Sequence, residues 1–177
     1  MDIFWEELTS GLPDTRELVR VVIRLLAATL LGAVVGIERE RAGKPAGLRT
    51  HILVTLGTTV FVLASSGVGM DMDGVSRVIQ GIATGIGFIG AGSILKLNEE
   101  RDIQGLTTAA GIWMTAAIGV AVGLGSLGVA LLSTLLTLII LASVGSFESR
   151  IGKRRAAQAE DRNQQAGAPD AGDRGAA

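Results

Sequence analysis

Three long stretches without any charged side chain constrain the fold of this chain more than any other feature. The longest covers the 45 residues from 103 to 147, and two others cover the 19 residues from 52 to 70 and the 18 residues from 78 to 95. A soluble core does not need such runs, whereas a helix that crosses a bilayer needs roughly 20 apolar residues. The sequence therefore predicts an all-α integral membrane protein.

These runs, together with an apolar segment near the N-terminus, predict a bundle of about five transmembrane helices. The first three helices are expected over residues 16–40, 51–68 and 78–95. The longest run divides at residues 123–128, GLGSLG, into two helices of about 20 residues each. All five helices are joined by short connections.

The placement of Lys and Arg predicts the orientation, because cytoplasmic loops carry an excess of both residues. They gather in the loop before residue 51, in the loop after residue 95 and just past the last helix. The N-terminus is therefore expected outside and the C-terminus inside. Residues 1–148 are predicted to form the transmembrane domain. Residues 149–177 are predicted to be a disordered polar cytoplasmic tail, because their composition cannot bury a core.

The stretch GIATGIGFIGAGSIL, residues 81–95, contains the GxGxxG pattern of dinucleotide-binding loops. Such a loop needs a preceding strand and a later acidic residue, whereas this one lies inside an uncharged run. One continuous helix is favoured, with small residues at four-residue spacing where helices approach closely. A broken helix that lines a cavity is one alternative, and the ordinary abundance of glycine in membrane helices is another. The expected packing glycines are Gly32, Gly36, Gly81, Gly85, Gly87, Gly90, Gly119 and Gly123.

Charged residues at membrane depth form a second group of candidates. Only 13 uncharged residues separate Arg24 from Glu38. A helical segment of that length is too short to span a bilayer core of about 30 Å. At least one of the two lies within the membrane or extends its side chain out of it, and both fall on one helix face. Intramembrane charge is a functional hypothesis by default. The alternative is that Arg20 and Arg24, and similarly Arg77 at the start of the third helix, reach the outer headgroups.

Other polar residues carry little chemistry. Asp71 and Asp73 offer oxygen ligands to a divalent cation, but two carboxylates make a weak site. His51 is expected to be an interfacial or capping group. The sequence has no cysteine, no nucleophile with an adjacent base and no metal cluster. We therefore expect neither an enzyme nor a bound cofactor, and the net charge of −1 argues against a nucleic-acid partner.

Three segments carry a resemblance to a known family. They are GAVVGIERERAGKPAGLRTHILVTLG, GIGFIGAGSIL and GLTTAAGIWMTAAIG, and together they resemble the membrane domain of the MgtC/SapB family. The resemblance implies a multi-pass protein of the bacterial inner membrane, with a role in magnesium or acid homeostasis or in stress and virulence adaptation. It also implies action on a membrane complex such as the F-type ATP synthase. Family members usually carry a cytoplasmic domain after the last helix, where this chain has only the polar tail.

The motif residues of the family map onto Glu38, Arg39 and Glu40, onto residues 46–50, onto Arg77 and onto residues 105–108. Their polar members, together with Arg24, form a candidate functional polar cluster. Pro45 and Gly47 predict a turn before the second long helix, which Thr50 is expected to cap. Arg49 is expected to pair with Glu38 or Glu40. Gly105 predicts another turn, with Thr107 or Thr108 as the cap of the next helix. The full candidate cluster is Arg24, Glu38, Arg39, Glu40, Arg49, Thr50, Arg77, Thr107 and Thr108. Plain helix-end architecture is the alternative interpretation.

Three functions compete on these observations. The first is a non-enzymatic protein that modulates a membrane complex. The second is a small ion or solute transporter or channel, with a path past Arg24, Glu38 and Arg77. The third is a purely structural bundle, and intramembrane charge discriminates among them because a conduit needs it. The lipid bilayer is the expected environment, and oligomerisation stays open.

Overall fold

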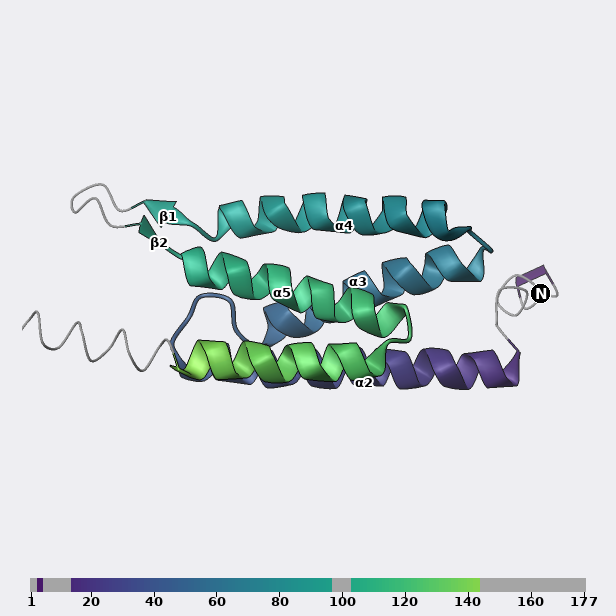
Figure 1. Cartoon of the computed structure of the whole chain (residues 1–177), viewed down its shortest axis with the longest axis horizontal. Coiled ribbons are helices and arrows are strands. Elements are labelled where there is room, and N and C mark those ends of the chain that lie inside the picture. The colour runs from purple at the N-terminus through teal and green to yellow at the C-terminus, as the bar shows by residue number, and fades with distance from the viewer. Residues whose placement is uncertain (1–2, 5–13, 97–102, 144–177) are drawn as a thin grey trace, which may run out of the picture. The chain divides into compact units, whose positions relative to one another are not determined.

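A computed structural model describes residues 3–4, 14–96 and 103–143 of the chain (Figure 1). Two antiparallel two-residue strands, β1 (Leu95–Lys96) and β2 (Ile103–Gln104), lie between α4 and α5. The described helices are α2 (Thr15–Arg41), α3 (Leu48–Gly67), α4 (Met72–Gly92), α5 (Leu106–Gly123) and Leu127–Ser143, which has no label in the figure. The predicted all-α bundle of five helices is confirmed.

Three of the described helices, α2, α3 and α5, are long and apolar enough to cross a membrane. The helix Leu127–Ser143 is apolar but shorter. α4 is not among these three helices, and Arg77 and Gln80 lie within it. The number of crossings and the expected orientation, with the N-terminus outside, stay predictions.

The chain separates into two units by its internal contacts, residues 1–139 and residues 140–177. The first unit contains α2 to α5 and most of the following helix. In the second unit the structure describes residues 140–143, which form the last turn of that helix. The predicted boundary between residues 148 and 149 lies outside the described residues, so it also stays a prediction.

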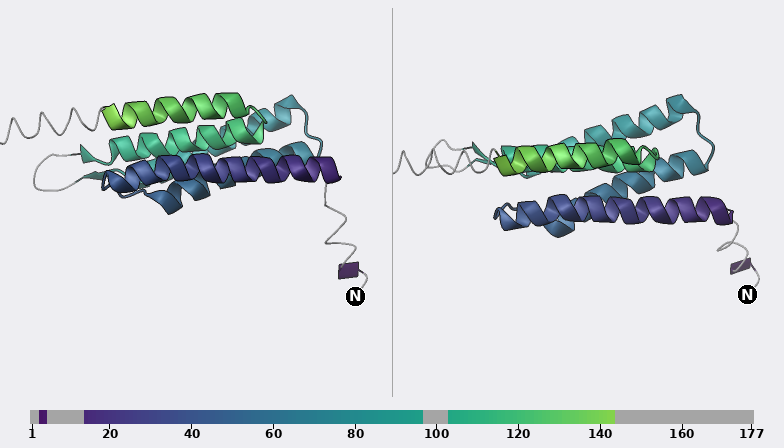
Figure 2. Two further views of the ribbon diagram at one scale, coloured as in Figure 1. Left: turned by 90° about the horizontal axis from the view of Figure 1, so that it is seen from below. Right: turned by 60° about the horizontal axis from the view of Figure 1, so that its bottom comes forward.

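Helix α3 is the centre of the first unit, and its buried face is polar. It packs against α2 on one side and α5 on the other, while α4 packs mainly on α5 and less on α3 (Figures 1 and 2). The Thr55 hydroxyl donates to the His51 carbonyl at 2.6 Å. The Thr59 hydroxyl donates across the interface to the Gly119 carbonyl at 2.8 Å. These buried hydroxyls therefore have partners, as burial in a bundle requires.

Four glycines on α2 and α5 let these helices approach the polar face of α3. A methyl group added at Gly36 would lie 2.6 Å from the Leu48 Cα, and one at Gly123 would lie 2.7 Å from the Val62 Cβ. A methyl at Gly32 would meet the Thr55 hydroxyl, and one at Gly119 would meet the Thr58 hydroxyl. The backbones of α2 and α5 therefore lie directly against backbone and side-chain atoms of α3, which is the close packing that small residues permit in membrane helices.

The glycines of α4 behave differently. α4 is one continuous helix, so neither a nucleotide loop nor a broken helix is present there. The expected close contacts at Gly81, Gly85 and Gly87 are wrong within the chain, because a methyl at any of them would meet no atom within 4 Å. A methyl at Gly90 would make only an ordinary contact, 3.6 Å from the Ala109 Cβ.

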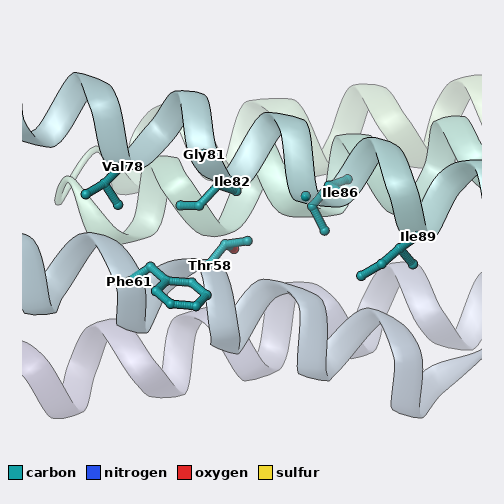
Figure 3. Close-up of a pocket in the computed structure, with 8 residues that line it drawn as sticks. Thr58, Phe61, Val78, Gly81, Ile82, Ile86 and Ile89 are labelled. Carbon is teal, nitrogen blue, oxygen red and sulfur yellow. The ribbon is translucent and has the colours of Figure 1, made fainter.

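An apolar groove of about 430 Å³ lies between α3 and α4 instead. Figure 3 shows Phe61 of α3 opposite the side chains of α4, among them Ile82 and Ile86. Ile86 is one of the three buried residues of α4. The isoleucine side chains lie between the backbones of α4 and α3 and keep them apart. Gly81 and Gly85 line the open groove.

Substitution of alanine for glycine should separate these two kinds of position. In Gly119→Ala the new methyl would lie 2.5 Å from the Thr55 carbonyl oxygen, so we expect a loss of about 1–3 kcal/mol from overpacking. Gly85→Ala should be neutral or slightly stabilising, because the space is open and alanine favours helix. Thermal unfolding of both variants in detergent measures the difference. A larger loss in Gly85→Ala than in Gly119→Ala would contradict the packing described here.

Candidate functional site

Two ionisable side chains are buried where α2 ends and α3 begins. Arg39 has 2% of its surface exposed and His51 has 1%. Arg39 continues the buried stripe of α2 that includes Gly32, Val35 and Gly36, so the helical repeat turns its side chain inward. His51 faces α5, where a methyl added at Gly111 would lie 3.8 Å from its Cε1. Full burial of an arginine is rare unless its charge has partners.

A buried hydrogen bond joins the His51 ring to α5. Its Nδ1 lies 2.7 Å from the Thr115 hydroxyl oxygen, and that hydroxyl donates its hydrogen to the Gly111 carbonyl at 2.8 Å. A hydroxyl has a single hydrogen, so when that hydrogen goes to the Gly111 carbonyl, the Thr115 oxygen accepts from Nδ1 of the ring. The Nε2 atom of His51 is buried without a hydrogen-bond partner.

Arg39 is held by one weak ion pair. Its Nη1 lies 3.8 Å from Glu38 Oε2, which is too long for a hydrogen bond. Arg39 Nε, Arg39 Nη2 and Glu38 Oε2 are all buried without a hydrogen-bond partner. Arg39 and the carbonyl of the buried Ala46 are electrostatic neighbours of His51. We call Glu38, Arg39 and His51 the buried polar cluster, and its unpartnered donors and acceptors mark it as the candidate site.

The connection from α2 to α3 is organised by Glu40 rather than by Thr50. Glu40 Oε2 accepts a hydrogen bond from the Leu48 backbone N–H at 3.0 Å, at the start of α3. The residue at the cap position is Gly47, which has no capping side chain, so the expected Thr50 cap is wrong. The ion pair in this region joins Arg39 to Glu38, and Arg49 is exposed. Glu40 thus serves as a cap from the preceding helix.

Helix α5 also begins differently from expectation. Its cap residue is Gly105 with φ at 94°, and no side chain caps the helix. A methyl at Gly105 would meet the Ser93 carbonyl, so this turn needs glycine both for its backbone angle and for space. Thr107 is exposed and Thr108 is buried one residue later. The predicted turn is confirmed, and the predicted threonine cap is wrong.

Arg24 lies far from the buried polar cluster. Its Nη1 donates to the Gly123 carbonyl at 2.9 Å, at the C-terminal end of α5, where a cation is favoured by the helix dipole. Gly123 is about 18 Å along α5 from Gly111, which contacts His51. Arg77 is exposed on α4. The structure therefore does not bring Arg24, Glu38 and Arg77 together as the lining of one path.

Two aspartates, Asp14 and Asp71, serve helix ends. Asp71 Oδ1 accepts from the Gly74 N–H at 2.8 Å and so caps α4. Among the residues that the structure describes, no group of three or more His, Cys, Asp or Glu side chains is placed to hold a metal ion. Sequence reasoning missed Thr115, whose only signal was a polar residue one helical turn after Gly111 in an apolar run.

Comparison with known proteins identifies a family and several relatives of this chain. The sequence profile of the MgtC family matches residues 25–150. Protein SrpB of Synechococcus elongatus is 43% identical over 130 residues, 67% of this chain and 71% of that protein. The putative magnesium transporter YhiD of Escherichia coli is 42% identical over 130 residues, 68% of this chain and 58% of that protein.

A third relative, Protein MgtC of Salmonella typhimurium, is 45% identical over 117 residues, 66% of this chain and 49% of that protein. The match thus spans about half of that relative and more than half of the other two. No solved structure matches the chain.

Replacement of Arg39 by methionine tests whether the buried guanidinium stabilises the fold. Apolar replacement of a buried, poorly paired charge is often neutral or stabilising. The free energy of unfolding of Arg39→Met should therefore lie within about 1 kcal/mol of that of the parent protein, or above it. Arg41→Met, two residues later and exposed, is the matched control. Thermal unfolding in detergent is the measurement. A loss of several kcal/mol would mean that Arg39 is needed for folding, and would remove the reason to regard it as a functional residue.

Proposed function

This chain belongs to the MgtC family, and from that premise we propose that it acts in magnesium or acid homeostasis by modulating another complex of the bacterial inner membrane. The name of one relative, putative magnesium transporter YhiD, supports the magnesium part of the proposal. Stress or virulence adaptation is the wider setting that the resemblance implies. The proposal includes no catalytic step, and the F-type ATP synthase is one partner that it covers.

The buried polar cluster is the observation that favours modulation over conduction of Mg²⁺. The charge inside the bundle at this end belongs to a guanidinium with 2% of its surface exposed, and its nearest carboxylate is 3.8 Å away. Two like unit charges 4 Å apart repel by about 4 kcal/mol at an effective dielectric constant of 20. A divalent cation that passed Arg39 would meet about twice that repulsion. Arg39 therefore suits a contact with an acceptor group better than a cation path.

The helix surfaces supply the place for such a partner. Phe88 on α4 is 84% exposed, and Leu53 on α3 is 67% exposed. Both lie on helices whose apolar side chains can meet lipid or another membrane protein. The connections from α2 to α3 and from α3 to α4 are short, so a partner is expected within the bilayer or at the connections that join α2 to α3 and α4 to α5.

A transporter for an ion or another solute is the second candidate. The printed name of YhiD favours it, and so do the unpartnered polar atoms of Glu38, Arg39 and His51. Polar groups inside a membrane bundle often mark a substrate or proton path. The two candidates differ in one measurable respect, because only a transporter moves an ion by itself.

Growth at limiting Mg²⁺ and flux in liposomes together test the proposal. A bacterial strain that lacks its own homologue should grow at low Mg²⁺ when it expresses the parent protein or Arg41→Met. Arg39→Met should fail to restore growth at equal expression, because it loses the buried donors. Purified parent protein in liposomes should give no saturable Mg²⁺ flux. Saturable flux would support the transporter instead, and full rescue by Arg39→Met would exclude the buried polar cluster from the function.

A further inference from the structure

A polar cleft lies at the end of the bundle away from the buried polar cluster, between the first half of α2 and the last half of α3. Its volume is about 410 Å³. Arg20, Arg24 and Glu17 line it from α2, and Val60, Leu63 and Ala64 are among its residues from α3. Charged groups therefore face an apolar wall across the same cleft. None of the functions considered above uses this arrangement.

The depth of the cleft follows from the hydrogen bond between Arg24 and Gly123. α5 has 18 residues, which corresponds to about 27 Å, close to the thickness of a bilayer core of about 30 Å. The end of α5, and with it Arg24, therefore lies near the boundary between hydrocarbon and headgroups when α5 crosses the membrane. Arg20 lies one helical turn beyond Arg24, about 6 Å further out, at the depth of lipid phosphate groups.

The charges of the cleft match one phosphodiester. Two guanidinium groups and one carboxylate line it, which leaves one positive charge to be neutralised. Arg24 uses Nη1 for the Gly123 carbonyl, and a guanidinium has further N–H groups to offer. Arginine binds phosphate oxygens with a fixed fork of donors, and basic pockets between membrane helices bind lipid headgroups. An acyl chain attached to the same molecule would lie along Val60 and Leu63.

We propose that this cleft is a binding site for a glycerophospholipid, with its phosphodiester at Arg20 and Arg24 and one acyl chain along α3. The apolar wall distinguishes this ligand from a free phosphate, which would leave Val60 and Leu63 uncovered. The two guanidinium groups distinguish it from a lipid without phosphate, which would leave the charges unpaired. Both halves of the cleft are thus needed for tight binding.

Native mass spectrometry of the full chain, released from detergent with added ligands, tests the site. The probes are phosphatidylglycerol, phosphatidylethanolamine, diacylglycerol and inorganic phosphate. Both phospholipids should bind, while diacylglycerol and inorganic phosphate should bind at least about tenfold more weakly, since each lacks one half of the interaction. Equal binding of diacylglycerol would reduce the cleft to an apolar surface and overturn the proposal. Equal binding of inorganic phosphate would make it an anion site without lipid, and would overturn it too.

Two variants locate the site without removal of the Arg24 contact with α5. Arg20→Gln should weaken phospholipid binding about tenfold or more, because it removes a charge-assisted interaction. Arg16→Gln, one turn earlier on α2 and exposed, should bind as the parent does. Ala64→Phe should block the cleft from the side of α3. Unchanged binding in both Arg20→Gln and Ala64→Phe, with melting temperatures like that of the parent, would place the lipid elsewhere and reject the cleft.

Discussion

The close contact of glycine backbone with α3 is the interaction on which the rest of this bundle depends. Lipid tails are as apolar as leucine, so helices in a membrane gain little from burying apolar surface against each other. Association then relies on close van der Waals fit. Gly32 and Gly36 of α2, and Gly119 and Gly123 of α5, bring both helices against α3. The threonine hydroxyls tolerate this burial because they bond to backbone carbonyls such as that of His51.

Tight packing also explains how Arg39 and His51 stay buried with incomplete partners. Desolvation of a charge costs several kcal/mol in a protein interior, and the 3.8 Å ion pair with Glu38 offsets little of it. The glycine contacts of Gly36 and Gly111 hold the surrounding helices in place regardless. Unpartnered polar groups in an otherwise satisfied interior are the places where sequences give up stability for function.

The sequence predicted the helices well and the roles of single residues poorly. Long uncharged runs have one solution in a bilayer, so the five helices followed from them. Small residues at four-residue spacing occur on α2, α4 and α5 alike, but the spacing does not say which face meets a neighbour. Only Gly32 and Gly119 and their companions on α2 and α5 do so closely, because α3 offers small threonines there while Ile82 and Ile86 keep α4 further away.

The candidate site was predicted in part: Glu38 and Arg39 were among the expected residues, while His51 and Thr115 were not, for the same reason. A side chain from another helix can replace a local cap, as Glu40 does for α3, and Arg24 caps the end of α5 across a hundred residues of sequence. Such contacts depend on how helices meet in space. His51 looked interfacial because it begins an uncharged run, and Thr115 had no charge to draw attention to it, yet the two form the hydrogen bond that orients the ring.

The open packing of α4 divides the bundle into parts of unequal local stability. One apolar groove separates α4 from α3, and another of about 150 Å³ separates it from α5. Gly69, with φ at 71° and open space around it, joins α4 to α3. Elements with few buried contacts open at lower free energy than the core. α4 is thus the most loosely packed of α2 to α5, and its backbone amides should exchange with solvent deuterium before those of the other three helices.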